Sequence, residues 1–179
     1  MEGQRETLVV VCAMKFWHLT KWKEWEVGRV YETNWDESNY WQHKKRLRFV
    51  DGLDRVVQEL KYRSELLKEY IFELERLKVC PGCPSRFNAM FLIPVDVDIE
   101  RFAGVFGMRG YKVVEVEVVD VFGIHRTDPS WLDCNLAEVE VIEAFARSYW
   151  RGDKRSELAE VLFRGRFRIV TRPSEVRLL

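Results

Sequence analysis

The sequence has few cysteines, few amide side chains, no long apolar run and no excess of charge of one sign. Four cysteines in 179 residues are too few for a disulfide scaffold. Asn and Gln are scarce while 32% of the residues are charged, a combination typical of heat-adapted proteins. The longest apolar run near the start, Leu8 to Met14, is far shorter than the ~20 residues of a membrane-spanning helix, and its flanks lack the layout of a secretory signal. We therefore expect a soluble, cytoplasmic protein without a membrane partner.

The charges balance, since the chain has 29 Lys and Arg residues and 29 Asp and Glu residues. This zero net charge argues against bulk binding to DNA, although it is compatible with a local basic patch. Hydrophobic residues make up 47% of the chain, which excludes a disordered or collagen-like protein. The length suits one domain over residues 1–179, and the sequence contains no repeat or low-complexity linker.

Hydrophobic periodicity predicts strands interspersed with three helices. The longest helix is expected over Leu53 to Lys78, where apolar residues recur at helical spacing and charged pairs such as Glu59 and Arg63 lie on the outer face. The other helices are expected from Asp96 or Asp98 to Phe106 and from Leu136 to Trp150. The expected strands are Leu8–Trp17, Arg29–Tyr31, Ala89–Ile93, Val113–Val119, Glu160–Phe163 and Phe167–Thr171.

The order of these elements indicates the fold class. They follow no regular βαβ rhythm, and a turn at Arg164–Gly165 between two strand-like runs favours antiparallel pairing. The sequence therefore predicts an α+β fold.

The common catalytic signatures are absent, and one cysteine pair stands out. The sequence has no Rossmann glycine motif after its first strand, no Walker A loop and no zinc-protease helix. Cys80-Pro-Gly-Cys83 supplies two ligands where a structural zinc needs four, and Cys134 and His125 are the residues that would complete such a site. We expect small buried thiols, with a disulfide or redox pair and a metal site as the alternatives, and we assign no metal.

Tryptophan and basic residues are interleaved between Trp17 and Arg48. Aromatic faces among cations suit stacking and charge contacts with a nucleotide or with single-stranded nucleic acid. The simpler interpretation, which we favour, is an edge of the core beside a solvated face of lysines. Taken singly, His18 after the first strand and Glu160 at the start of a late strand are also most simply structural residues.

Three short motifs in order resemble those of the ADP-ribosyltransferase superfamily. The first is Phe16-Trp-His18-Leu-Thr20, soon followed by Val27-Gly-Arg-Val. The second is Met90-Phe-Leu before a helix with Arg101-Phe-Ala, and the third is the stretch from Glu160 to Val170, with its glycine after Arg164. The stretch Cys80–Phe87 and the pattern Tyr149-Trp-x-Gly are similar to an uncharacterised family allied to these enzymes.

Two positions depart from the pattern of the superfamily. Phe91 stands where that pattern commonly has Tyr, which removes a hydroxyl and keeps a stacking ring. Leu158 stands two residues before Glu160, where arginine-modifying members have a second acidic residue. Modification of protein arginine is therefore not expected.

The resemblance implies a fold and a site. The fold would be α+β with split antiparallel β-sheets and flanking helices, and NAD would bind in the cleft between the sheets with its nicotinamide innermost. Glu160 would stabilise the positive charge that develops on the ribose when the nicotinamide–ribose bond breaks. His18 would hydrogen-bond a ribose hydroxyl and Thr20 would fix that edge, while the backbone of Leu19 would pair with the carboxamide.

The remaining implied contacts come from the middle of the chain. Phe91 would stack on the nicotinamide. Arg86 would either meet the pyrophosphate through a forked contact or brace the loop around Pro84. The expected protein is thus an NAD-dependent transferase-like enzyme whose acceptor is open: protein, nucleic acid, a small molecule or water.

Two other functions fit the same residues. One is a non-catalytic module that binds a nucleotide or RNA on the same scaffold. The other is an RNA 2′-phosphotransferase-like enzyme, in which NAD accepts a phosphate from RNA, and the basic, tryptophan-rich segment favours it. Nicotinamide release, a requirement for 2′-phosphorylated RNA, or binding without product would distinguish the three.

Overall fold

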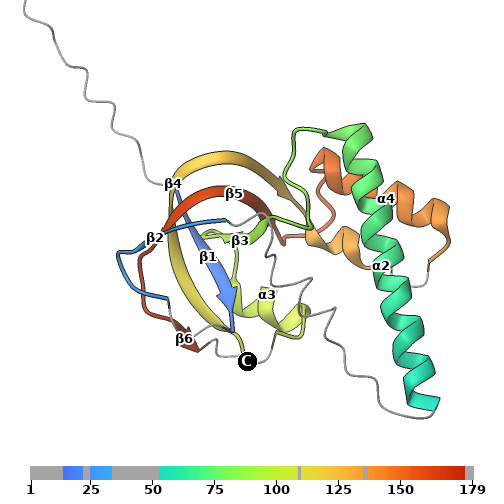
Figure 1. The fold of residues 1–179 in the computed structure, drawn as a ribbon, viewed down its shortest axis with the longest axis horizontal. Coiled ribbons are helices and arrows are strands. Elements are labelled where there is room, and N and C mark those ends of the chain that lie inside the picture. Colours follow the sequence, from blue (N-terminus) through green and yellow to red (C-terminus); the bar gives the residue numbers. More distant parts are fainter. Residues whose placement is uncertain (1–13, 22–24, 34–52, 109, 135–136, 176–179) are drawn as a thin grey trace, which may run out of the picture.

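The computed structural model describes residues 14–21, 25–33, 53–108, 110–134 and 137–175 of the chain. Figure 1 shows a curved sheet on one side and the helices α2 and α4 on the other. The elements are β1 (Lys15–Thr20), β2 (Val30–Glu32), α2 (Leu53–Val79), β3 (Met90–Pro94), α3 (Ile99–Val105), β4 (Lys112–Thr127), a 3₁₀ turn (Pro129–Leu132), α4 (Val139–Arg151), β5 (Glu160–Ile169) and β6 (Ser174–Glu175).

Most expected elements are present with shifted ends. The long helix is confirmed as α2, and Asp98 caps α3 by accepting hydrogen bonds from two backbone amides at 3.0 Å. β4 runs to Thr127, beyond the expected end at Val119, because its second half pairs along β5. α4 begins at Val139 rather than Leu136. Much of the tryptophan-rich segment, and residues 8–13 of the first expected strand, lie outside the described residues.

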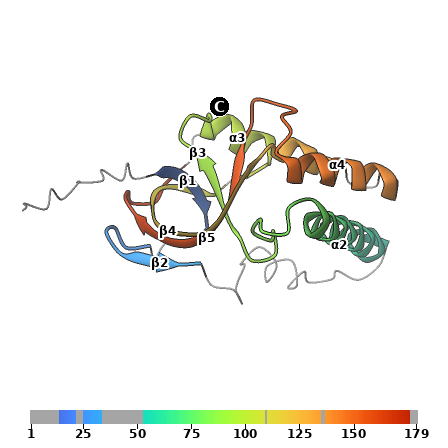
Figure 2. The same ribbon diagram turned by 90° about the horizontal axis from the view of Figure 1, so that it is seen from above.

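The strands pair antiparallel and form one sheet that closes on itself. Its order is β2-β5-β3-β1-β4-β6, with an additional pairing between β4 and β5. The strands β5, β3, β1 and β4 therefore make a barrel-like sheet, with α2 and α4 outside it (Figure 1 and Figure 2). This arrangement confirms the expected α+β class.

The inside of the barrel is apolar. Along β4, Val114 and Val116 are fully buried in it, while Glu115 and Glu117 lie on the other face, as the alternation in the sequence predicts. The other strands complete this core with Leu92, Val161, Phe163, Phe167 and Ile169. The valines of β4 thus hold the two halves of the closed sheet together.

The expected turn at Arg164–Gly165 is wrong, because β5 runs unbroken through both residues. Gly165 has a φ of 152°, and a Cβ atom there would overlap the carbonyl oxygen of Asp120 on β4. The register between β4 and β5 shifts in the same region. The glycine therefore marks a close approach of two strands rather than a reversal of the chain.

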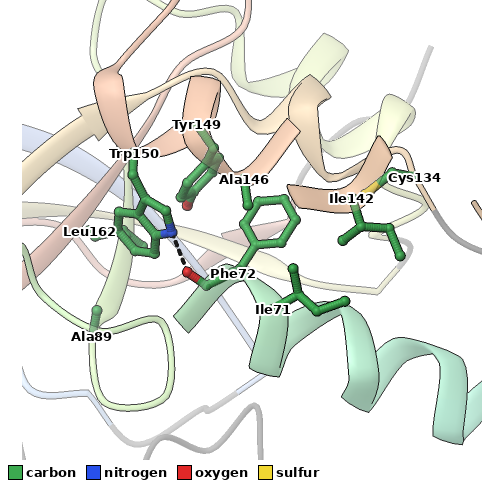
Figure 3. Close-up of a cluster of buried hydrophobic side chains, with 9 residues drawn as sticks. All are labelled: Ile71, Phe72, Ala89, Cys134, Ile142, Ala146, Tyr149, Trp150 and Leu162. Atoms are coloured by element: carbon green, nitrogen blue, oxygen red, sulfur yellow. Dashed lines mark hydrogen bonds between the residues drawn. The ribbon is translucent and has the colours of Figure 1, made fainter. Parts of the chain in front are cut away.

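A second core joins the helices to the outer face of the sheet (Figure 3). Phe72 of α2 lies edge-on to Tyr149 of α4, and Trp150 donates its Nε1 hydrogen to the carbonyl oxygen of Phe72 at 2.6 Å. Ala89 and Leu162 bring the residue before β3 and the strand β5 into this cluster. The contact fixes both helices against the start of β5.

The face that α2 buries differs from the one that its apolar residues suggest. Leu60, Leu67, Tyr70, Leu74 and Leu77 are each at least 50% exposed. The buried face carries charged residues beside Ile71 and Phe72: Lys68, Glu69, Glu75 and Arg76. The first three have partners on other elements or loops, and Arg76 donates to carbonyl oxygens of the loop that follows α2. A partner is the condition for burying a charge. Among the described helices, none is both long and apolar enough to cross a membrane.

Candidate functional site: a buried arginine–carboxylate cluster

A buried carboxylate stands at the start of β5. Glu160 is 6% exposed, and its Oε1 accepts hydrogen bonds from the Tyr149 hydroxyl at 2.5 Å and from Arg86 Nη1 at 3.0 Å. Both bonds end on Oε1, so Oε2 accepts no hydrogen bond from the part of the chain that the structure describes. Among the described residues, Glu160 is therefore anchored through Oε1.

Arg86 joins this carboxylate to a second one. Its Nε and Nη2 donate to the two oxygens of Glu69 on α2, at 2.9 and 3.4 Å. Its guanidinium lies over the rings of Phe91 and Tyr149, at 5.1 and 5.2 Å from their centroids. We call Glu69, Arg86, Tyr149 and Glu160 the Arg86 cluster, and all four are buried. Arg86 thus ties the loop after α2 to β5, as the bracing alternative predicts, and its contact with a pyrophosphate stays a prediction.

Neighbouring loops hold Tyr149 and Glu160 in place. The carbonyl oxygen of Tyr149 accepts a 2.7 Å hydrogen bond from the hydroxyl of Thr127, which pairs with Glu160 across β4 and β5. Asp128 accepts hydrogen bonds from the backbone amides of Arg155 and Ser156, just before β5. Burial acts to raise the pKa of Asp128, but two hydrogen bonds from Ser130 and those from Arg155 and Ser156 lower it. The start of β5 is therefore fixed on both sides.

Burial and mutual charge set the protonation of the cluster. Burial raises the pKa of Glu160, while the charge of Arg86 and the bond from Tyr149 act to lower it. Burial also raises the pKa of Tyr149 well above its usual range, so the hydroxyl keeps the proton that it donates. Burial acts to lower the pKa of Arg86, but Glu69, Tyr149 and Glu160 raise it well above its usual value. Arg86 is thus a permanent cation between two carboxyl groups.

His18 contacts this region from another direction. Its Nδ1 lies 2.9 Å from the carbonyl oxygen of Phe91, and its ring lies 5.5 Å from that of Trp25. Burial lowers the pKa of His18 to about 4, although the bond to Phe91 acts to raise it. The imidazole is therefore neutral near pH 7, with its proton on Nδ1, since a carbonyl oxygen can only accept.

The strand register places His18 and Glu160 on opposite faces of the sheet. Phe91 pairs with Leu162, which lies on the same face of β5 as Glu160. His18 pairs with Val114, whose side chain is buried inside the barrel. The structure therefore brings Glu160, Phe91 and Arg86 together on the helical side. It does not bring the side chain of His18 into this group, and the link between them is the Phe91 carbonyl.

The two residues after His18 have separate surroundings. Leu19 packs on the outer face of the sheet, against the cluster of Ile93 and Phe102. Thr20 is 4% exposed and pairs with Lys112 at the end of β1. Thr20 therefore shares the face of His18, and Leu19 shares the face of Phe91.

A hollow of about 490 Å³ opens near the end of β1. Its lining is Trp25, Glu26, Val27, Lys112, Arg172 and Pro173. Trp25 links the hollow to His18, and the buried Trp25 Nε1 has no hydrogen-bond partner among the described residues. One aromatic ring beside two cations suits a ligand that combines a flat ring with phosphate.

Sequence reasoning missed part of both regions. Lys112 and Arg172 meet Trp25 only through the folded sheet, so no local pattern marks them. Glu69 lies in a long, highly charged helix, where a glutamate resembles a surface residue. Tyr149 belongs to the Tyr-Trp-x-Gly pattern, and this signal could have placed it beside Glu160.

The expectation of two small buried thiols at Cys80 and Cys83 is wrong, because the pair forms a disulfide. The backbone amide of Cys83 donates to the carbonyl oxygen of Cys80 at 2.9 Å, which closes a turn over Pro81 and Gly82. The free Cys134 is buried elsewhere, in the core between the helices. Among the residues proposed to complete a metal site, the structure brings His125, and not Cys134, to the pair.

The fold and the Arg86 cluster define an α+β protein whose closed antiparallel sheet carries a buried arginine–carboxylate site on its helical side. Residues 44–176 match the model of a family described as a protein of unknown function, DUF2441. The match runs from before α2 to the end of β6 and includes the whole Arg86 cluster. The chain belongs to this family. No curated protein matches the sequence.

Proposed function

We propose that the chain is an NAD-dependent ADP-ribosyltransferase-like enzyme that cleaves the nicotinamide–ribose bond. The observation that carries the proposal is the state of Glu160, whose Oε1 is anchored while Oε2 accepts no hydrogen bond from the described residues. A carboxylate held in this way is preorganised to stabilise positive charge on a ribose ring. Oε2 is then the oxygen that would accept a hydrogen bond from a ribose hydroxyl.

The order of the strands supports the proposal. β1, β3 and β5 carry the three motifs of the resemblance, and they are neighbours in the sheet although they are distant along the chain. β4 pairs with β1 over Lys112–Glu117 and with β5 over Val116–Thr127, with register shifts after Val118 and Val121. We take these two overlapping stretches of β4 as the counterparts of the split antiparallel sheets that the resemblance implies.

The residues divide the work in the proposed site. Glu160 stabilises the developing charge, Phe91 supplies a ring for the nicotinamide, and Arg86 acts to lower the pKa of Glu160 against the effect of burial and offers a cation to the pyrophosphate. His18 acts on this site as a positioning residue, because its imidazole holds the carbonyl of Phe91. The backbone of Leu19 stays assigned to the carboxamide edge, while the ribose contact expected of Thr20 is not part of this site, because Thr20 shares the face of His18.

The test is nicotinamide release from NAD by the full chain, with protein, nucleic acid and water offered as acceptors. Glu160→Gln keeps the shape of the side chain and removes its charge, so we expect turnover to fall at least ~100-fold while NAD binding and the melting temperature change little. Glu157→Gln is the matched control, because that side chain is 74% exposed in the loop just before β5. It should release nicotinamide at the parent rate.

Equal nicotinamide release by Glu160→Gln and the parent would overturn the assignment of Glu160. If the parent releases no nicotinamide with any acceptor, the proposed enzymatic activity is overturned. Release only in the presence of 2′-phosphorylated RNA would replace transfer with RNA 2′-phosphotransferase chemistry.

A second candidate is a non-catalytic module that binds a nucleotide or RNA, and the hollow beside His18 favours it. Trp25, Lys112 and Arg172 line the hollow on the side of the sheet where Glu160 does not lie. A nucleotide bound there would stack on an aromatic ring and place its phosphates near two cations, without reaching the carboxylate of Glu160. Binding without turnover follows from this geometry.

Calorimetry separates the two candidates. If the hollow binds NAD, Lys112→Ala with Arg172→Ala should weaken binding at least ~10-fold, and Glu160→Gln should not. Arg101→Ala is the control, since Arg101 is exposed on α3 and away from the hollow. Unchanged affinity in the Lys112→Ala/Arg172→Ala variant would contradict binding at the hollow.

A further inference from the structure

Hydrogen bonds from Arg76 hold the loop that follows α2 in place. Its Nη1 donates to the carbonyl oxygens of Pro81 and Cys83, at 2.8 and 3.0 Å. Its other guanidinium nitrogens donate to the carboxylate of Glu73 at 2.8 and 3.0 Å. Glu73 also accepts a hydrogen bond from the hydroxyl of Ser85 at 2.8 Å. The backbone carrying Cys80 and Cys83 is thus held by helix α2 as well as by the disulfide. Opening the disulfide leaves these hydrogen bonds in place.

β4 brings a third donor to this loop. A Cβ atom on Gly123 would lie 3.1 Å from the ring of Pro84, so a larger residue would push the loop away from the strand. Two residues further along β4, His125 places a ring nitrogen so that it and the two sulfur atoms all lie within 4.8 Å of one another. The three donors come from two elements that are distant along the chain.

A backbone carbonyl fixes one nitrogen of the His125 ring. Nε2 of His125 lies 3.3 Å from the carbonyl oxygen of Tyr149, and burial lowers the pKa of the ring. With Nε2–H donating to that carbonyl, the lone pair lies on Nδ1. A histidine ligand usually fixes its second nitrogen in this way, by donating to a carbonyl or carboxylate.

We propose that Cys80, Cys83 and His125 form a zinc site when the disulfide is reduced, with one coordination position left for water or an exogenous ligand. Two thiolates and an imidazole are donors that Zn²⁺ prefers, and Zn–S bonds of ~2.3 Å at tetrahedral angles separate two sulfurs by about 3.8 Å. Rotation of the two reduced side chains on the loop held by Arg76 achieves this separation. The described residues offer no fourth His, Cys, Asp or Glu to the group.

Reduction of the disulfide and binding of zinc conserve atoms, protons and electrons. An external dithiol transfers two electrons and two protons to the disulfide and becomes a disulfide itself, and the loop then holds two thiols. Binding of Zn²⁺ releases both protons to solvent and forms two Zn–S bonds and one Zn–N bond. An external disulfide that takes two electrons back from the two thiolates reforms the Cys80–Cys83 bond and releases Zn²⁺, so the site exists only in the reduced protein.

The experiment is an anaerobic titration of the reduced full chain with Co²⁺, followed by displacement with Zn²⁺. A Cys12→Ala/Cys134→Ala background leaves Cys80 and Cys83 as the only cysteines, so any sulfur-to-cobalt charge-transfer band comes from this pair. We expect one Co²⁺ per chain, with the band lost on oxidation. Cys80→Ser and His125→Gln should each weaken binding roughly 100-fold or more, since even second-shell changes cost 10–100-fold.

Thermal stability and the substituted variants serve as controls for the zinc site. Zn²⁺ should raise the melting temperature of the reduced parent and not that of the oxidised parent or the Cys80→Ser variant. A reduced parent that takes up no Co²⁺ would overturn the site and leave a redox or structural disulfide. Equal affinity in His125→Gln and the parent would overturn the role of His125. Loss of binding in the Cys12→Ala/Cys134→Ala background would assign the metal to other sulfurs.

Discussion

Arg86 is a cation that lies between two buried carboxyl groups. Substitutions of Arg86 and of Glu160 should therefore have different effects on stability. The side chains of Arg86, Glu69 and Glu160 are 6%, 2% and 8% exposed. Removing the guanidinium would take away the positive charge that lies between the two buried carboxyl groups, and loss of one partner of a buried ion pair typically costs about 3–5 kcal/mol. Glu160→Gln leaves Arg86 paired with Glu69. The glutamine variant therefore tests chemistry, while an Arg86 variant would mainly test stability.

The neutral imidazole of His18 predicts a pH dependence of stability. Its pKa is about 4 in the folded chain and near 6.5 when the side chain is free. Between these values the unfolded chain binds more protons, so this contribution to stability is complete above the upper value and declines as the pH falls toward the lower one. Replacement by glutamine removes the titration and keeps a donor for the Phe91 carbonyl.

Urea unfolding of the parent and of His18→Gln, at pH values of about 4.5 and 7.5, measures this effect. The parent should lose more stability on acidification than the variant does. His125→Gln is the matched comparison, because burial also lowers the pKa of His125. An identical loss in the parent and His18→Gln would mean that His18 titrates normally.

At the scale of the element, α2 shows what periodicity alone can predict. Helical spacing gives the existence and length of the helix correctly. It does not give the buried face, because Glu69 and Glu75 are buried by partners that lie far along the chain, Arg86 and Arg147. A sequence pattern treats a glutamate as a polar surface residue, whether or not the folded chain brings a cation next to it. Ion pairs across the fold therefore decide the orientation of this helix.

Because α2 buries only one face, two substitutions close together on it should lower the free energy of unfolding by different amounts. Leu74→Gln changes a residue that is 57% exposed and should alter the free energy of unfolding by less than about 1 kcal/mol. Phe72→Ala empties a fully buried position against Tyr149 and should cost about 3–5 kcal/mol. Chemical denaturation measures both. Equal costs would mean that the exposed stripe on α2 is covered in solution.

At the scale of the molecule, closure of the sheet explains what the sequence could and could not predict. The resemblance placed His18, Phe91 and Glu160 around one site. Phe91 and Glu160 lie on the same face, with Arg86 between them, but His18 lies on the other face. The placement of His18 depends on the register between β1 and its neighbours, and a shift of one residue moves a side chain to the other face. No local feature of Phe16 to Thr20 encodes that choice. The pairing of β4 with β5, which closes the barrel, is likewise absent from any short pattern.

Gly165 is the position where this closure is most sensitive. The prediction concerns Gly165→Ala, whose new methyl group would overlap the Asp120 carbonyl oxygen and lie 2.8 Å from the ring of Phe163. The two strands must separate there, so we expect a loss of roughly 3 kcal/mol or more in the free energy of unfolding. Gly104→Ala in α3 is the control, because open space surrounds that position and alanine favours a helix by up to ~1 kcal/mol. Thermal and chemical unfolding of both variants should therefore move in opposite directions, and a Gly165 variant as stable as the parent would mean that β4 and β5 do not approach so closely.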